Sequence, residues 1–263
     1  MSKTLGLALG SGGARGVAHV GFLQALEEEG IKPDFISGCS MGAVVGGCYA
    51  SGMPVSKMRD IVLKLRKRDL IDLSPKPISQ MSLLRSKKIR ELLLAHLKVK
   101  NIEDFPVPFK CVATDLYSGT LHVFEKGEAA LAIQASSTIP AVFRPVQFED
   151  KLLVDGGCLC RVPVREVKSM GADVVVAVDV LKICSEPVEK LDNILNMGLR
   201  VFDVMDAHNT ALMKKRDSKY FDLWLAPEMK GMSQYVIKDL EFAFEEGYAE
   251  GKKNADKIKE LLK

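Results

Sequence analysis

Two strand–turn–helix units follow each other at the start of the chain, and this order limits the possible fold more than any other feature. The first leads from the apolar run TLGLALG through a glycine-rich loop into an amphipathic helix that ends at Gly30. The second leads from DFISG through Ser40 into a helix of small residues, MGAVVGGCYA. The later run DVVVAVDV contains the unbroken apolar segment that strands of a buried parallel sheet have. The alternation predicts a three-layer α/β/α fold with a mostly parallel central sheet.

The remaining elements continue this alternation. Residues 56–100 indicate two helical segments around a proline-containing link, LSPKPISQ. Strands are expected at FKCVATD and TLHVFEKG, a helix at EAALAIQASS, and a hairpin in AVFRPVQFEDKLLVDGG that turns at Glu149 and Asp150. Two long helical patterns, about 190–216 and 234–262, flank a last strand signal, YFDLWLA. The methionine-rich part of the first pattern is expected to pack against the sheet.

Length and composition indicate an ordinary globular protein. The chain has 263 residues, of which 47% are hydrophobic and 27% charged, enough to bury a large core, so one domain over 1–263 is expected. No apolar run approaches the roughly 20 residues of a membrane span, and the start of the chain lacks a secretory signal pattern. The six cysteines show neither a CxxC motif nor a Cys/His cluster, which favours reduced thiols in the cytoplasm. A net charge of +3 gives no reason to expect a nucleic-acid partner.

Ser40 lies in a G-x-S-x-G pattern between Gly38 and Gly42. A serine hydroxyl becomes a nucleophile when it is exposed, has a base beside it and faces donors for the developing oxyanion. A tight turn between a strand and a helix supplies the exposure, and glycines on both sides remove side chains that would collide there. The pattern also occurs by chance, so a small turn residue is the alternative.

The glycine-rich loop GSGGARG offers several backbone amides to one anion, because it joins a strand to the start of a helix. A nucleotide loop is the alternative, but Arg15 stands where G-x-G-x-x-G has its third glycine, and no GK[ST] follows. An oxyanion loop fits better. Its candidate residues are Gly12, Gly13, Ala14, Arg15 and Gly16.

Asp155 follows a short apolar strand in LLVDGG, and Gly156 and Gly157 allow the chain to turn away directly after it. A carboxylate at a strand end could serve as a base for the serine. Asp-Gly-Gly is also a good turn sequence, and without further context the turn is the favoured interpretation.

Together these blocks resemble the patatin-like phospholipase family, whose members use a serine–aspartate dyad without histidine on an α/β sheet. GSGGARGVAHVGFLQALEEEGI is similar to the family's oxyanion loop and helix, and GCSMG to its nucleophile elbow. ASSTIPAVFRPV resembles the block between elbow and acid, and DGG followed by GADVVVAVDV resembles the aspartate segment. The blocks occur in the family's order and cover most of the chain.

The resemblance implies a role for each site. Ser40 is the expected nucleophile and Asp155 its base, the amides of Gly12 and Gly13 form the oxyanion hole, and Arg15 supports the loop. One departure stands out: the family reads D-G-G-x-x-N-x-P, whereas this chain has DGGCLCRVP, with Cys160 at the asparagine position and Arg161 next. A thiol cannot replace the hydrogen bonds of an amide, so the bracing of this loop stays open.

The implied reaction is acyl transfer to water, with fatty acyl esters, and lysophospholipids or phospholipids first, as substrates and no metal or cofactor. The same residues would serve an acyl-thioester or small-ester hydrolase. Two alternatives belong to other functional classes: a nucleotide-binding module, and a lipid-binding or regulatory protein without catalytic activity. The cysteines near Ser40 and Asp155 could provide redox control of activity, but the favoured role is that of small apolar residues that fill space in the core.

Histidines and basic residues leave two further questions. His19 lies one turn into the first helix and would be the base of a rival Ser-His-Asp triad, although a packing role is favoured. His208 falls on the stripe of Ile194, Val201, Met205 and Leu212, which predicts a place in the core or at a helix interface.

Residues 57–100 carry 13 Lys/Arg against 4 Asp/Glu. That excess suits peripheral contact with anionic lipid at the inner membrane face, and equally a solvated helix face.

Overall fold

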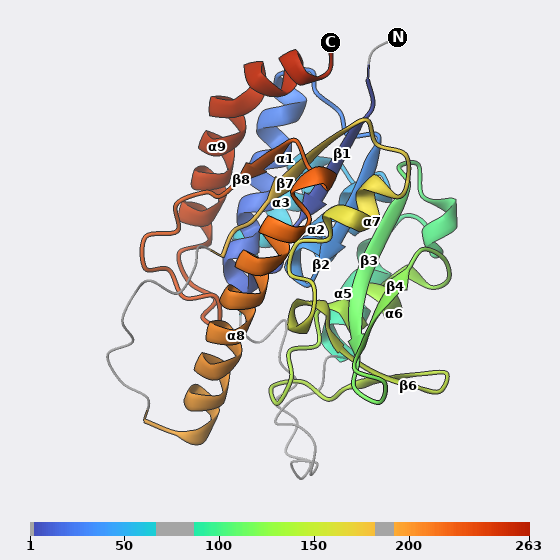
Figure 1. Cartoon of the computed structure of the whole chain (residues 1–263), viewed down its shortest axis with the longest axis vertical. Helices are drawn as coiled ribbons and strands as arrows, with labels where there is room; N and C mark the ends of the chain where they lie inside the picture. The colour runs from blue at the N-terminus through green and yellow to red at the C-terminus, as the bar shows by residue number, and fades with distance from the viewer. Residues whose placement is uncertain (1–2, 67–86, 182–191) are drawn as a thin grey trace.

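A central sheet organises the computed structural model, which describes residues 3–66, 87–181 and 192–263 (Figure 1). Along the sheet the strands follow the order β5-β6-β3-β2-β1-β7-β8, and β4 also pairs with β3. Five strands run parallel: β1 (Leu5–Leu9), β2 (Phe35–Cys39), β3 (Phe109–Asp115), β7 (Val174–Val178) and β8 (Leu223–Leu225). Three are antiparallel to their neighbours: β4 (Thr120–Phe124), β5 (Val146–Phe148) and β6 (Lys151–Asp155).

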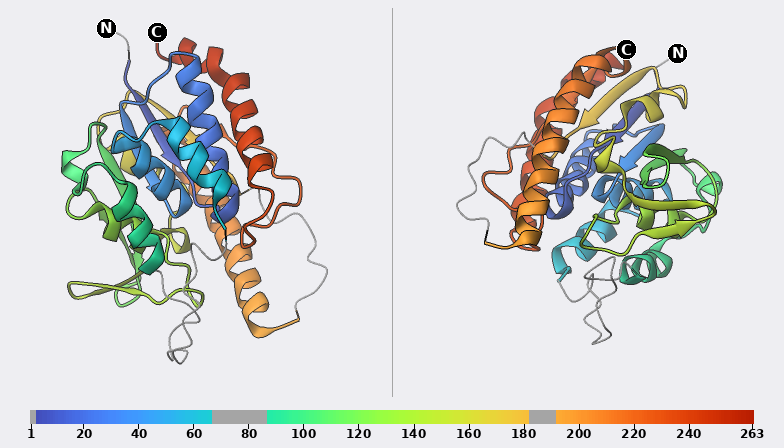
Figure 2. Two further views of the ribbon diagram at one scale, coloured as in Figure 1. Left: turned by 180° about the vertical axis from the view of Figure 1, so that it is seen from behind. Right: turned by 60° about the horizontal axis from the view of Figure 1, so that its bottom comes forward.

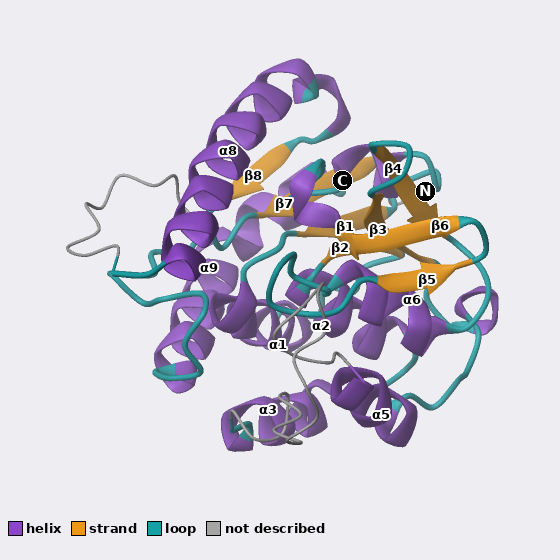
Figure 3. Cartoon of the chain, turned by 90° about the horizontal axis from the view of Figure 1, so that it is seen from below, coloured by secondary structure: helices purple, strands orange, loops and turns teal. Residues whose placement is uncertain are grey.

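Helices cover both faces of this sheet, as Figure 3 shows. One face carries α1 (Ala18–Glu28), α2 (Met41–Ala50), α6 (Ala129–Ser136) and α9 (Leu240–Leu261). On the outer side of this layer lie α3 (Val55–Lys64) and α5 (Lys87–His96). The other face carries α7 (Val164–Lys168) and α8 (Ile194–Arg216). The expected three-layer α/β/α fold with a mostly parallel sheet is therefore confirmed.

The alternation of side chains along β1 explains why both faces need cover. Leu5, Leu7 and Leu9 point into the large core beneath α1 and α9, whereas Ala8 joins a smaller cluster that includes Val164 and Val167 of α7. All five residues of β1 and of β7 are buried. Central strands with apolar residues at every position are stable only between two helical layers, which is the arrangement that the unbroken apolar runs predict.

Most expected elements occur where the sequence predicts them. The first helix begins as a 3-10 helix over Gly13–Val17 before it becomes α1, and Gly30 has a φ of 72° just after α1 ends. The hairpin of β5 and β6 turns at Glu149, whose φ is 53°. Short 3-10 turns lie at Ile102–Asp104, Gly156–Cys158 and Ser218–Tyr220. The expected link LSPKPISQ lies outside the described residues.

One expectation about α8 is wrong. The stripe of Ile194, Val201, Met205 and Leu212 does not pack against the sheet, since each of these side chains is at least half exposed, and His208 is exposed with them. The helix instead turns its polar residues Asp206 and Thr210 inward, where they form buried hydrogen bonds. Periodicity identified an amphipathic helix correctly, but polar partners in the body of the protein decided which face is buried.

No helix in the described part of the chain has an apolar stretch of the length needed to cross a membrane.

Candidate active site

Ser40 occupies a tight turn between the end of β2 and the start of α2. Its backbone has φ 53° and ψ −121°, a conformation that costs energy in any residue other than glycine. The turn is held because α2 packs closely on β1: a Cβ atom at Gly42 would lie 2.1 Å from the carbonyl oxygen of Leu9. The expected elbow geometry is therefore present, and strain of this kind is typical of functional turns.

Ser136 holds this elbow from a distant part of the chain. The Ser40 amide donates a hydrogen bond of 3.0 Å to the Ser136 hydroxyl, which is fully buried at the end of α6. Two residues later the Thr138 carbonyl accepts a 2.8 Å hydrogen bond from the Asp155 amide. The sequence alone assigns no role to these two residues; the available signal was the run ASST at the end of an apolar helix.

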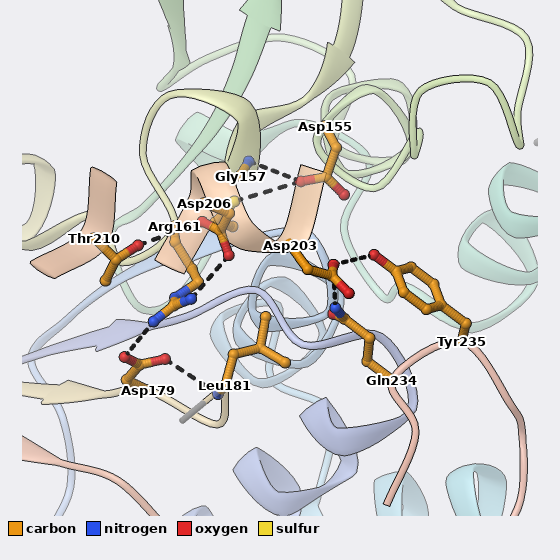
Figure 4. Close-up of polar contacts among 11 residues, drawn as sticks. Asp155, Gly157, Arg161, Asp179, Leu181, Asp203, Asp206, Thr210, Gln234 and Tyr235 are labelled. Carbon is orange, nitrogen blue, oxygen red and sulfur yellow. Dashed lines mark hydrogen bonds and ion pairs between the residues drawn. The ribbon is translucent and has the colours of Figure 1, made fainter. Parts of the chain in front are cut away.

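Asp155 comes close to the elbow because β3 lies between the two strands that carry the site. Cys39, the residue before Ser40, pairs with Val112 of β3, and Asp155 pairs with the next residue, Ala113. Carboxyl oxygen Oδ1 accepts a 2.8 Å hydrogen bond from the Gly157 amide and contacts the Cys39 sulfur at 3.8 Å (Figure 4). Strand β3 therefore holds Cys39, and with it the Ser40 turn, close to Asp155.

Burial sets the electrostatics of the Asp155 carboxyl. The residue is 2% exposed, and burial raises its pKa from 3.8 to about 6, while the nearby Ser40 hydroxyl and the Gly157 amide oppose this rise. Within the described residues, oxygen Oδ2 is buried without a hydrogen-bond partner. A carboxylate with a raised pKa and an uncommitted oxygen is chemically suited to accept a proton near neutral pH.

The glycine-rich loop is fixed at both ends and leaves its middle amides available. Ser11 donates to the Arg161 carbonyl at 3.0 Å, and Ala14 donates to the Gln234 carbonyl at 2.9 Å. Among the described residues, the amides of Gly12 and Gly13 between them have no acceptor elsewhere in the chain. Gly13 has a φ of 51°, and a Cβ there would lie 2.2 Å from the Gln234 oxygen, so glycine is required.

Arg15 and His19 also contact this loop or its surroundings. The Arg15 side chain donates a hydrogen bond to the Met232 carbonyl, which ties the loop to the segment before α9. His19 is completely buried, its Nε2 lies 2.8 Å from the Gly10 carbonyl oxygen, and burial lowers its pKa to about 4. Nδ1 has no hydrogen-bond partner among the described residues, so neither ring nitrogen bonds to Ser40. The geometry agrees with the packing role.

Arg161 supplies the bracing that the sequence left open. This residue is 3% exposed, and its guanidinium donates to Asp179 at 2.9 Å and to Asp206 at 2.8 Å (Figure 4). Its carbonyl accepts the Ser11 amide. One residue therefore joins the segment after Asp155, the glycine-rich loop, the end of β7 and helix α8. A charged residue inside an apolar sequence was the signal for a buried ion pair, but its partners could not be read from it.

Cys160 takes no part in this bracing through its side chain. It packs in a small cluster with Cys39 and Val112, and its amide donates to the Gly156 carbonyl at 2.8 Å. Burial raises the pKa values of the Cys39 and Cys160 thiols well above 9.0, so both stay protonated at neutral pH. Both cysteines are therefore unreactive, as expected of residues that fill space in an apolar cluster.

Residues 7–168 match the family model described as patatin-like phospholipase. This chain belongs to the patatin-like phospholipase family. The match begins within β1 and ends at α7, so it includes the glycine-rich loop, Ser40 and Asp155.

Curated relatives of this chain include NTE family proteins of mycobacteria and lysophospholipases of yeasts. An uncharacterised NTE family protein of Mycobacterium bovis is 40% identical over 177 residues, which are 67% of this chain and 49% of that protein. The lysophospholipase NTE1 of Candida albicans is 34% identical over 185 residues, 68% of this chain and 13% of that protein. The match thus spans at most about half of these relatives.

Two solved structures share the fold at low sequence identity. VipD of Legionella pneumophila has a TM-score of 0.61 and 16% identity, covering 97% of this chain and 67% of its own. ExoU of Pseudomonas aeruginosa, solved with SpcU, has a TM-score of 0.53 and 15% identity, covering all of this chain and 53% of its own. The patatin-like architecture therefore extends beyond the residues that the family model matches.

Proposed function

We propose that this protein is a serine hydrolase that cleaves fatty acyl esters, with lysophospholipids or phospholipids as its leading substrates. One observation carries the proposal: Ser40 lies in a strained strand–helix turn beside the buried Asp155 carboxyl, and both residues lie within the segment that matches the family model. The lysophospholipase name of the yeast relatives supports the substrate class.

In the proposed mechanism the Ser40 hydroxyl attacks the ester carbonyl and Asp155 takes its proton. The amides of Gly12 and Gly13 then donate to the oxyanion, and water hydrolyses the acyl-enzyme after the alcohol has left. A pKa of about 6 makes Asp155 a stronger base than an exposed aspartate. Each oxyanion donor typically lowers the barrier by on the order of 3 kcal/mol. No step in this scheme requires a metal or cofactor.

Acyl thioesters and small esters are alternative substrates, because they react through the same tetrahedral intermediate. A panel that compares lysophospholipids, acyl thioesters and a short-chain ester at equal concentration separates these possibilities.

We further propose peripheral contact with the cytoplasmic face of a membrane. The excess of basic residues in 57–100 supports this contact, although 67–86 lie outside the described residues.

We also propose that residues 1–263 form a single domain. This is supported by β7 and β8, which lie beyond the matched residues but continue the same sheet.

Labelling with a fluorophosphonate, followed by mass spectrometry of the adduct, tests the proposed nucleophile. The wild type should carry the adduct on Ser40, and Ser40→Ala should not be labelled. Ser37→Ala is the matched control, since Ser37 lies in β2 three residues before Ser40 but its buried hydroxyl donates to the Pro163 carbonyl at 2.7 Å. Unchanged labelling of Ser40→Ala would refute the assignment.

A further inference from the structure

Helix α8 exposes a row of large apolar side chains, with the exposed His208 between the last two of them. Their spacing of three, four or seven residues places them on one face of the helix. The exposed fractions are 83% for Ile194, 50% for Met197, 52% for Val201, 59% for Met205 and 56% for Leu212. We call these five residues the α8 stripe. A contiguous apolar surface of this kind is uncommon on a protein that has no partner there.

The inward face of α8 explains why the stripe stays outside. Asp206 accepts from the buried Arg161 guanidinium and from Thr210, and Asp203 accepts hydrogen bonds from Gln234 and Tyr235 (Figure 4). Rotating the helix to bury the stripe would break these contacts and leave buried charges unpaired. The fold therefore fixes the α8 stripe toward the surroundings.

The charge of α8 is unequal between its two faces. Both acidic residues of the helix, Asp203 and Asp206, point inward to the partners just described. Lys215, three residues after Leu212, is exposed on the side of the stripe, whereas Lys214 lies over the Trp224 ring of β8 at 4.9 Å. The outward surface of the helix thus combines apolar side chains with a positive charge and carries neither of the helix's acidic residues, which is a composition found in helices that bind anionic lipid. A second copy of the chain would bring equal charges together on the same surface.

The location of α8 also favours a lipid surface. Figures 1 and 2 show its amino-terminal turns extending past the central strands at the end of the sheet where those strands finish. Ser40 follows the last residue of β2 at this same end. A projecting helix presents a convex apolar surface, which can enter a bilayer interface without obstruction from the body of the protein.

We propose that the α8 stripe docks this protein on an anionic bilayer, with the Ser40 end of the sheet toward the lipid. The role of this docking in catalysis rests on the proposed lipid hydrolase function, whereas the binding itself does not require turnover. It is separate from the basic region 57–100, which contributes no residue to α8.

Co-sedimentation with vesicles tests the proposal. The Ser40→Ala protein is used so that hydrolysis does not alter the vesicles, which contain phosphatidylcholine alone or mixed with phosphatidylglycerol. Val201→Ser with Met205→Ser should lower partitioning onto the mixed vesicles by about tenfold or more, because both side chains lose their apolar contact. The matched control, Val201→Ile with Met205→Leu, keeps the surface apolar and should bind as before. Pure phosphatidylcholine should bind the parent protein more weakly.

Wild-type partitioning by the double serine variant would overturn the proposal. A dimer seen by light scattering that the serine pair dissociates would also overturn it, since the stripe would then bind a second copy. Fluorophosphonate labelling and short-chain ester hydrolysis are measured in parallel on the chain with Ser40 intact. Vesicle binding that depends on the stripe, in a protein without esterase activity, would reject the hydrolase proposal but support docking. Normal vesicle binding by the double serine variant, in a protein with esterase activity, would support the hydrolase proposal but reject docking through the stripe.

Discussion

At the residue scale, the Asp155 carboxyl combines two properties that usually exclude each other. It is almost fully buried, yet the proposed mechanism requires it to be ionised so that it can accept the Ser40 proton. The Gly157 amide stabilises the ionised form, and burial favours the neutral form more strongly, so the pKa settles at about 6. The proposed mechanism therefore has an ionised base at neutral pH without a histidine.

This pKa predicts the pH dependence of the reaction. Because only the ionised carboxyl acts as base, kcat/KM for a soluble ester should rise as pH increases through about 6 and then level off. Asp155→Asn should lower kcat by about 10²- to 10⁴-fold and remove this limb of the profile. A pH–rate profile of both proteins provides the measurement, and an Asp155→Asn enzyme that keeps wild-type turnover would rule out the dyad.

His19→Ala separates a structural role from a catalytic one. The change leaves the buried Gly10 carbonyl without its donor, so the free energy of unfolding should fall by about 1–3 kcal/mol. Activity of the folded protein should persist, with the same pH midpoint, since neither ring nitrogen bonds to Ser40. Urea unfolding and the pH profile measure the two effects, and loss of the pH limb would instead mark His19 as the titrating base.

At the element scale, Arg161 joins segments that lie far apart along the chain. Its ion pairs connect the segment after Asp155 with the end of β7 and with α8, and its carbonyl accepts the Ser11 amide of the glycine-rich loop. Burial raises the pKa values of Asp179 and Asp206 while Arg161 opposes this, so both carboxylates depend on the same cation. The position of α8 and the shape of the glycine-rich loop are therefore coupled.

Arg161→Met should be strongly destabilising. It leaves two buried carboxylates unpaired, and the loss of one partner of a buried ion pair typically costs about 3–5 kcal/mol. Arg90→Met is the control, because both side chains of the Arg90–Glu128 pair are 37% exposed and such pairs contribute about 0–1 kcal/mol. Urea denaturation of both variants gives the comparison, and equal losses would contradict a special role for Arg161.

At the scale of the whole molecule, one sheet connects the matched residues with the rest of the chain. β7 pairs with β1 on one side and with β8 on the other, and α9 packs beside α1 in the large core. Segments from both ends of the chain thus share one core, and they should unfold together.

Thermal unfolding tests this cooperativity. The chain has a single tryptophan, Trp224, on β8 and beyond the matched residues, where it packs against the cluster that includes Val164 of α7, so its fluorescence reports whether the carboxyl-terminal strand stays joined to the matched part. Far-ultraviolet circular dichroism reports all elements. In a single two-state domain the two transitions should coincide. Two separate midpoints would indicate that the chain divides into independent units.

The sequence by itself determined the order of the elements and the position of the candidate dyad. Apolar runs and glycine turns are local signals, so they predicted β1, β2, α2 and the Ser40 elbow close to their observed bounds. The resemblance of separate blocks to one family added Asp155. The roles of Ser136 and Arg161 escaped prediction, because Ser136 lies 96 residues from Ser40 and Asp206 lies 45 residues from Arg161 along the chain.

Only the tertiary structure decided which face of α8 is buried and how basic Asp155 is. Periodicity shows that a helix is amphipathic, but its orientation depends on which face finds the better partners, and here the buried Arg161 outweighed the apolar stripe. The pKa of Asp155 likewise depends on burial and on groups from other strands. Both properties arise from contacts between distant segments, and these contacts exist only once the chain has folded.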